Sequence, residues 1–215
     1  MVSSRTTAWL AVGLGAAWMV ALSARGAVHA SRTGSTGVHL PSGARQSAGW
    51  ASAALGISGF VSLVAAVVLQ VQGRQDPWFG SWLFVGAGVG LVVAGAAVSI
   101  GAQMVMGSSW RVGVDFDERT ELVTTGLFAL SRNPIYLGMI TSLGGFAMLA
   151  PSWLSLGGFV LSAAGSSVHV RLVEEPYLVK THGDDYRRYA SRVGRFLPGL
   201  GRGAVEPQRR SADGC

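Results

Sequence analysis

Residues 77–110 read PWFGSWLFVGAGVGLVVAGAAVSIGAQMVMGSSW, a run of 34 residues without a single Asp, Glu, Lys or Arg. Three further charge-free runs cover residues 6–24, 46–73 and 133–170, so that 119 of the 215 residues lie in such runs. Each surface helix of a water-soluble domain needs a polar face, whereas a helix crosses the hydrocarbon of a bilayer with about 20 apolar residues. The sequence therefore predicts an all-α integral membrane protein and disfavours a soluble one.

We expect a polytopic bundle of about five membrane-spanning helices, followed by a cytoplasmic C-terminal helix. The run 133–170 is long enough for two short spans, and Pro151-Ser152 is a natural break in its middle. The predicted spans are 8–24, 50–72, 80–104, 135–150 and 153–170.

The first of these segments has a second interpretation. Arg5 precedes an apolar run that ends in the small residues Ala21-Leu22-Ser23-Ala24, as in a secretory signal peptide. The next stretch carries Arg25, Arg32 and Arg45, which is typical of a retained cytoplasmic loop. We therefore expect the segment to stay as a span.

The basic residues predict the orientation of the bundle. Of the 17 Lys and Arg residues, 15 fall in the segments 25–49, 105–134 and 171–215, and only Arg5 and Arg74 fall elsewhere. Because cytoplasmic segments are enriched in Lys and Arg, we expect an external N-terminus and a cytoplasmic C-terminus. Basic residues beside a membrane favour anionic headgroups, so the net charge of +6 does not require a nucleic-acid partner.

Composition divides the chain into three regions. We expect N-terminal membrane helices and loops over residues 1–79, a functional membrane core over 80–200, and a disordered tail over 201–215. The four His residues show none of the spacings of a closed metal site, so no bound metal is expected.

Gly86 and Gly88 form a Gly-x-Gly motif inside a charge-free span. A dinucleotide-binding fingerprint requires a preceding strand and a following helix, and that context is missing here. Small residues let membrane helices approach closely. For this motif alone, helix packing is the favoured interpretation.

The segment Arg132-Asn133-Pro134-Ile135-Tyr136 lies where a polar loop enters the membrane. Pro134 biases Asn133 away from helix, and Tyr136 offers a flat apolar face with a polar tip. The same residues also suit a simple helix start, with Arg132 as a cytoplasmic anchor and Tyr136 in the aromatic belt. The pattern leaves a binding role and a structural role equally open.

The pair Glu174-Glu175 lies at the inner end of the last predicted span. Adjacent carboxylates there carry a repulsion and desolvation cost unless a cation meets them. Arg171 precedes Glu175 by four residues, so a regular helix would bring these two together. The alternative is a solvated stop-transfer sequence, although such sequences are normally basic. A ligand with a sulfonium and an ammonium group would also be a suitable cationic partner.

Together these motifs resemble the isoprenylcysteine carboxyl methyltransferase and phospholipid methyltransferase superfamily of membrane enzymes. The resemblance extends from about Gly86 to Pro198. The segments 122–126 (LVTTG) and 132–138 (RNPIYLG) are similar to the family's Leu-Val-x-x-Gly and Arg-His-Pro-x-Tyr-x-Gly block, and the pair 174–175 with the following segment 183–189 (GDDYRRY) is similar to its C-terminal block. Asn133 stands where the carboxyl methyltransferases have His, and the phospholipid branch often has Asn there.

The resemblance implies that residues 80–200 are a methyltransferase-like catalytic core that binds S-adenosylmethionine at the cytoplasmic ends of the last helices. It implies a cofactor pocket formed by the Gly-x-Gly and both motif blocks: Gly86, Gly88, Leu122, Val123, Asn133, Pro134, Tyr136, Glu174 and Glu175. Catalytic roles would fall to Arg171, which would face the substrate, and to Asn133 and Tyr136, which would position the cofactor.

The implied reaction is methylation of a lipophilic or membrane-embedded small molecule at the cytoplasmic face. A phospholipid amine or thiol methyltransferase is an alternative, and so is a non-catalytic membrane scaffold of the same fold. A carboxylate or thiolate acceptor needs no general base, whereas an ammonium must first lose its proton. No residue of the motifs is an evident base.

Overall fold

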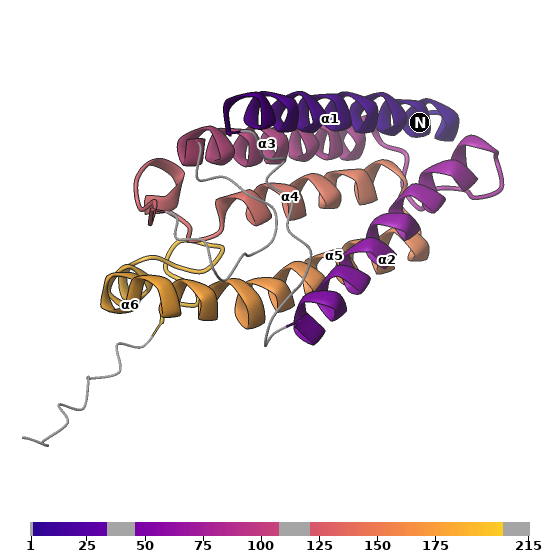
Figure 1. Ribbon diagram of the computed structural model, residues 1–215. Coiled ribbons are helices and arrows are strands. Elements are labelled where there is room, and N and C mark those ends of the chain that lie inside the picture. Colours follow the sequence, from indigo (N-terminus) through magenta and orange to yellow (C-terminus); the bar gives the residue numbers. More distant parts are fainter. Residues whose placement is uncertain (1, 34–45, 108–120, 204–215) are drawn as a thin grey trace, which may run out of the picture.

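The computed structural model describes residues 2–33, 46–107 and 121–203. Its helices are α1 (Ser4–Thr33), α2 (Gln46–Val71), α3 (Trp82–Met106), α4 (Pro134–Leu149), α5 (Trp153–His169) and α6 (Glu175–Arg192). A 3₁₀ turn, η3 (Gly126–Ala129), precedes α4, and a π-helical turn, η4 (Val170–Glu174), joins α5 to α6. Figure 1 shows α4 between α3 and α5, with α2 packed against α5 and α1 on the outside of the bundle.

The predicted fold class is confirmed. Helices α1, α2 and α3 and the continuous helix formed by α5, η4 and α6 are each long and apolar enough to cross a membrane, while α4 is a shorter apolar helix of 16 residues. The residues described contain no strand. The chain is thus a multi-pass membrane protein with five helical segments.

Two predicted boundaries are wrong. The first helix has 30 residues and extends to Thr33, well past the predicted end at residue 24. Arg25 lies inside it and donates from Nη2 to the carbonyl of Gln103 at 2.9 Å, so this charged side chain is bound to α3 and does not mark a loop. The predicted tail also begins later, because the amide of Gly203 donates to the carbonyl of Ala190 at 2.9 Å. The rest of that tail, 204–215, lies outside the described residues.

The connections alternate between two ends of the bundle, as five spans require. At one end, here called the N-terminal end, the amide of Val2 donates to the carbonyl of Gly80 at 2.8 Å and that of Trp78 donates to the carbonyl of Pro151 at 3.1 Å. Gln70 joins the same end by donating to the carbonyl of Ser4 at 2.8 Å. Residues 121–133 and 170–203 lie at the opposite, C-terminal end. The sidedness of this arrangement in the membrane stays a prediction.

Small residues form the contact between α3 and α4. A Cβ added to Gly138 would lie 2.5 Å from the carbonyl oxygen of Gly95, and one added to Gly145 would lie 2.5 Å from that of Gly88. Within lipid, apolar side chains gain little by leaving one apolar medium for another, so helices associate through close packing. The packing interpretation of Gly88 is therefore confirmed, whereas the space beside Gly86 is open.

A second seam of small residues joins α2 to α5. A Cβ on Gly158 would lie 2.7 Å from the carbonyl oxygen of Gly59, and one on Gly165 would lie 2.7 Å from the amide nitrogen of Gly56. The buried residues of α2, among them Gly49, Ser52, Gly59 and Ala66, are three, four or seven positions apart, which keeps them on one helical face. Helix α2, from the predicted N-terminal region, is thus packed directly on the predicted core.

Replacing Gly145 by Ala should destabilise the bundle, because the added methyl group collides with the backbone of α3. We expect a loss of about 1–3 kcal/mol, the usual cost of overpacking, measured as a lower Tm of the detergent-solubilised protein. Gly90→Ala is the matched control, since nothing lies within 4 Å of its added Cβ. Equal melting temperatures for the two variants would contradict the close packing of α3 and α4 at Gly145.

Candidate functional site

The C-terminal end of the bundle is built where the start of α4 meets the segment that follows α6. The amide of Arg132 donates to the carbonyl of Gly194 at 2.9 Å, and the Asn133 Nδ2 amide donates to the carbonyl of Arg195 at 2.9 Å. Pro134 occupies the first turn of α4 and is fully buried, where its missing N–H costs no helical hydrogen bond. These contacts join the predicted motif 132–136 to the segment that follows α6, here called the C-terminal segment (residues 193–203).

A buried ion cluster forms there around Glu175. Its Oε1 lies 2.8 Å from Arg132 Nη1, and Arg195 binds both carboxylate oxygens, with Nε at 2.8 Å from Oε1 and Nη2 at 2.7 Å from Oε2. The Arg132 side chain is 3% exposed and that of Glu175 is 15% exposed. Breaking such a buried pair from one side leaves an uncompensated charge, so the cluster fixes the relative positions of its three segments.

The remaining donors of Arg132 extend the cluster. Its Nη2 donates to the carbonyl of Gly201 at 2.6 Å, and its Nη1 donates to the Tyr186 hydroxyl at 3.1 Å. Burial raises the pKa of Tyr186 to about 12, with Glu175 adding to this and Arg132 opposing it. The phenol is therefore neutral at physiological pH. The bidentate hydrogen bond to Glu175 likewise raises the pKa of Arg195.

Glu174 faces a different set of groups. Tyr136 on α4 donates its hydroxyl to Glu174 Oε1 at 2.9 Å, and His169 Nε2 at the end of α5 lies 3.7 Å from the same oxygen. Ser52 on α2 lies 3.1 Å from His169 Nδ1. Four segments therefore contribute polar groups to one site beside the ion cluster.

The predicted pairing of Arg171 with Glu175 is wrong. In the described part of the chain Arg171 is exposed and makes no ion pair, while Glu175 is held by Arg132 and Arg195. The cause is the π turn η4, in which the amide of Glu175 bonds to the carbonyl of Val170. The extra residue of this turn shifts the helical register and precedes Pro176, which cannot donate a helical bond.

The structure brings most of the predicted site residues together. Asn133, Pro134, Tyr136, Glu174 and Glu175 all lie at the C-terminal end, with Asn133 only 6% exposed. Leu122 packs there against the buried tyrosines of α6, and Val123 beside it is half-buried.

Gly86 and Gly88 are not part of this group. They lie near the start of α3, and Gly88 contacts Gly145, close to the turn at residues 150–152. Ser99 of α3 lies beside Gly138, at the end of the bundle that holds the site. The helical rise places Gly86 about 20 Å from Ser99 along α3. The structure thus separates this motif from the two carboxylates.

Sequence reasoning missed several residues of the site, namely Ser52, His169, Tyr186 and Arg195. The adjacent carboxylates did signal a need for cations, but Arg195 is twenty residues from Glu175 in sequence and no helical spacing links them. Two buried atoms, Arg132 Nε and His169 Nε2, have no hydrogen-bond partner among the described residues. Buried polar atoms are nearly always satisfied, so a water molecule or a ligand atom is expected beside each of them.

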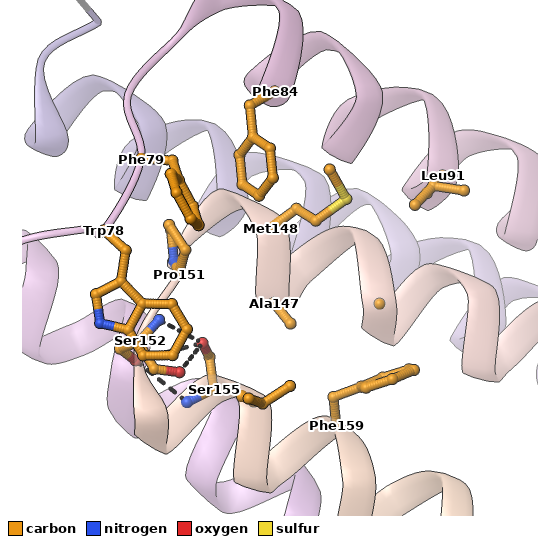
Figure 2. Close-up of a pocket in the computed structure, with 12 residues that line it drawn as sticks. Trp78, Phe79, Phe84, Leu91, Ala147, Met148, Pro151, Ser152, Ser155 and Phe159 are labelled. Carbon is orange, nitrogen blue, oxygen red and sulfur yellow. Dashed lines mark hydrogen bonds between the residues drawn. The ribbon is translucent and has the colours of Figure 1, made fainter.

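The structure also contains an apolar cavity of about 330 Å³ at the other end of the bundle (Figure 2). It lies between α3, α4 and α5, and its walls include Trp78, Phe84, Met148 and Phe159. The hydroxyls of Ser152 and Ser155 in its wall are used in capping the start of α5. No charged residue lines this cavity, so it is not the site of the polar chemistry. No group of three or more His, Cys, Asp or Glu suited to a metal occurs in the part of the chain that the structure describes.

Residues 83–185 match the model of a family described as phospholipid methyltransferase. The match begins in α3, ends in α6 and includes both Gly-x-Gly residues and the carboxylate pair. No curated protein and no solved structure gives a significant match. The resemblance inferred from the motifs is confirmed.

Replacing Glu175 by Gln should destabilise the fold strongly, because Arg132 would be left buried without a counter-charge. We expect a loss of about 3 kcal/mol, seen as a fall in Tm in detergent.

The matched control is Asp185→Asn, which removes a carboxylate from the exposed pair with Arg188. Exposed pairs contribute about 0–1 kcal/mol, so this control should melt near the wild-type temperature. If Glu175→Gln were as stable as the control, the ion cluster would not stabilise the C-terminal end of the bundle.

Proposed function

We propose that this chain, whose residues 83–185 match the phospholipid methyltransferase family, is an S-adenosylmethionine-dependent methyltransferase that acts on a lipophilic or lipid substrate. The observation that carries the proposal is the polar site at the C-terminal end of the bundle. It is assembled from family motif residues, among them Tyr136, Glu174 and Glu175. It lies where membrane helices end, so a headgroup at the bilayer surface can reach it.

The donor set suits S-adenosylmethionine. The carboxylate of Glu174 can accept hydrogen bonds from an ammonium group or ribose hydroxyls, and the Nε–H of Arg132 can donate to a carboxylate. Leu122 and Val123 offer apolar surface beside them. When bound, the cofactor supplies an electrophilic methyl group on a sulfonium. Gly86 and Gly88 are left out of this proposal because of their distance from the site.

The protein's own contribution is positioning and exclusion of water. The hydroxyl of Tyr136 fixes the Glu174 carboxylate at 2.9 Å, and the Asn133 amide ties the start of α4 to the C-terminal segment. Alignment of two reactants in this way can supply several kcal/mol of the barrier reduction, about 7 kcal/mol or more in favourable cases. Arg171 is exposed on η4, where it is available to bind the phosphate of a lipid headgroup.

The substrate would enter laterally from the bilayer. The outward faces of α2, α3 and α5 carry large exposed apolar side chains such as Phe60, Leu83 and Val160, as lipid-facing helices do. A membrane-dissolved acceptor would therefore meet the cofactor without leaving the lipid phase.

Calorimetric titration of the detergent-purified protein with S-adenosylmethionine should show micromolar binding. Glu174→Gln should weaken it at least about tenfold, a loss of about 1.4 kcal/mol, because a hydrogen-bonding carboxylate is removed while Tyr136 keeps a partner.

Asp184→Asn is the matched control, since Asp184 forms an exposed pair with Arg187 on α6, and its affinity should equal that of the wild type. Glu174 is preferred to Glu175 as the test position because Glu175→Gln also threatens the fold. A folded wild type that binds no cofactor would instead support a non-catalytic membrane scaffold.

Labelling of Cys215, the only cysteine of the chain, tests the proposed cytoplasmic site. A membrane-impermeant maleimide should fail to label it in intact cells and should label it in inverted membrane vesicles, because the positive-inside pattern predicts a cytoplasmic C-terminus. A cysteine introduced at Gln75, in the turn between α2 and α3, is the control and should show the opposite pattern. Labelling of Cys215 from outside the cell would reverse the topology.

A further inference from the structure

Large apolar side chains lie exposed in the C-terminal segment, after the last span has ended. Leu197 is 49% exposed and Leu200 is 63% exposed. A third leucine, Leu130 (59% exposed), lies beside them in the fold, because the next residue, Ser131, bridges to Gly194. Neither the ion cluster nor the proposed reaction uses these side chains. Apolar groups that gather on a surface outside the spans indicate an interaction surface.

Leu197 and Leu200 are the ends of a closed turn, here called the 195–202 turn. The amide of Leu200 donates to the carbonyl of Leu197 at 3.1 Å. Pro198 and Gly199 occupy the two central positions, and Gly199 has a φ of +78°, as a type II turn requires. The amide of Arg195 donates to the carbonyl of Leu200 at 2.8 Å and closes the loop. The backbone therefore holds both leucines in place before any partner binds.

The attachment of this turn to α4 determines its depth in the membrane. Its neighbour Gly194 accepts from the amide of Arg132, and Arg195 accepts from the side chain of Asn133, directly before the first turn of α4. Helix α4 has 16 residues, which makes it about 24 Å long, and the hydrocarbon of a bilayer is about 30 Å thick. The start of α4 thus lies at the boundary between hydrocarbon and headgroups. The 195–202 turn lies at the same boundary.

The same part of the chain has an excess of positive charge. Residues 186–203 contain five Arg and no Asp or Glu. Two of these arginines pair with aspartates of α6, and Arg195 pairs with Glu175. Arg192 and Arg202 are exposed and form no ion pair with another residue that the structure describes. Two uncompensated cations beside exposed leucines complement a leaflet that contains anionic headgroups.

We propose that the 195–202 turn is a membrane anchor, which inserts Leu197 and Leu200 among the lipids of an anionic leaflet. Arg192 and Arg202 would bind the phosphates of the surrounding headgroups. Long basic side chains can reach the headgroups while their apolar stems stay in contact with lipid. The partner of this surface is thus the bilayer itself, recognised by its negative charge.

The anchor is coupled to the ion cluster, because the same turn provides two of its contacts. The guanidinium of Arg195 binds Glu175, and the carbonyl of Gly201 accepts from Arg132 at 2.6 Å. A leaflet that holds the turn in place also holds these groups in place. Anionic lipid should therefore stabilise the closed C-terminal segment. This inference does not depend on the methyl transfer proposed above and would apply equally to a non-catalytic scaffold.

The first test measures the depth of the turn. Cys215→Ser leaves the chain without cysteine, so Leu200→Cys can then be labelled alone with the fluorophore bimane. In nanodiscs of phosphatidylcholine and phosphatidylglycerol, nitroxide-labelled lipid should quench this label, and aqueous iodide should not.

A label at Asp185→Cys is the matched control for depth. Gly183, with a φ of +53°, breaks α6 and turns the chain back toward α4, so Asp185 lies near the point farthest from the membrane. Its side chain is 73% exposed, and iodide should quench a label there while nitroxide lipid should not. Iodide quenching at position 200 would overturn the proposal. Protection of that label from both quenchers would also overturn it, because protein would then cover the turn.

The second test measures the dependence on lipid charge. Hydrogen exchange of the C-terminal segment should be slower by about tenfold or more in discs that contain phosphatidylglycerol than in phosphatidylcholine discs, because two arginines each gain from the surface potential. The double variant Arg192→Gln/Arg202→Gln should exchange at the same rate in both kinds of disc.

Arg187→Gln/Arg188→Gln is the matched control for lipid charge, since it removes the same charge from side chains that pair with Asp184 and Asp185. It should keep the wild-type dependence on phosphatidylglycerol. Exchange of the wild type at equal rates in both discs would overturn the proposal. An equal loss of the dependence in both double variants would do so too, since net charge and not the anchor would then be responsible.

Discussion

The C-terminal end of this molecule depends on one buried carboxylate held between two guanidinium groups. Glu175 binds Arg132, which precedes α4, and Arg195, which follows α6. Arg132 in turn binds the carbonyl of Gly201 and the hydroxyl of Tyr186. Because a buried charge is tolerated only when it is paired and hydrogen-bonded, these contacts must form together. The polar segment after the last span is therefore held against the membrane helices by these ion pairs and hydrogen bonds, together with the packing of Leu122 on its buried tyrosines.

The π turn η4 gives two adjacent glutamates different surroundings. Neighbouring residues of a regular helix point about 100° apart, and the extra residue of η4 changes which groups each of them meets. Glu175 is directed into the ion cluster, and Glu174 is directed toward Tyr136 and His169. The first carboxylate is neutralised by guanidinium groups and stabilises the fold. The second is hydrogen-bonded to the phenol of Tyr136. Single-turn π-helical insertions are frequent at functional sites, and this division of roles is a physical reason for one here.

Much of the fold follows from the sequence because the bilayer imposes a strong constraint. Charge-free runs predict the spans, and their order predicts the alternation of connections that the structure shows. The errors have local causes: Arg25 stays in helix because Gln103 on a neighbouring helix accepts its hydrogen bond, and the register change at η4 defeats the spacing that paired Arg171 with Glu175. For the site, the motif residues Asn133, Tyr136, Glu174 and Glu175 do come together. Arg195 and Ser52 could not have been predicted, because they reach the site only through tertiary contacts between segments distant in sequence.

The two seams of small residues decide how well the polar site is preorganised. Gly165 on α5 lies against the backbone of Gly56 and Ser52, one turn from the contact between Ser52 and His169. Gly138 on α4, two residues after Tyr136, lies in the same way against Ser99 on α3. Close approach of the helix backbones is what allows a side chain as short as that of Ser52 to reach an imidazole on the facing helix. Hydroxyl, imidazole and phenol are thus positioned by helix packing, and groups on packed helices are held more precisely than groups on loops. The glycines of the two seams therefore affect the geometry of the site as well as the stability of the bundle.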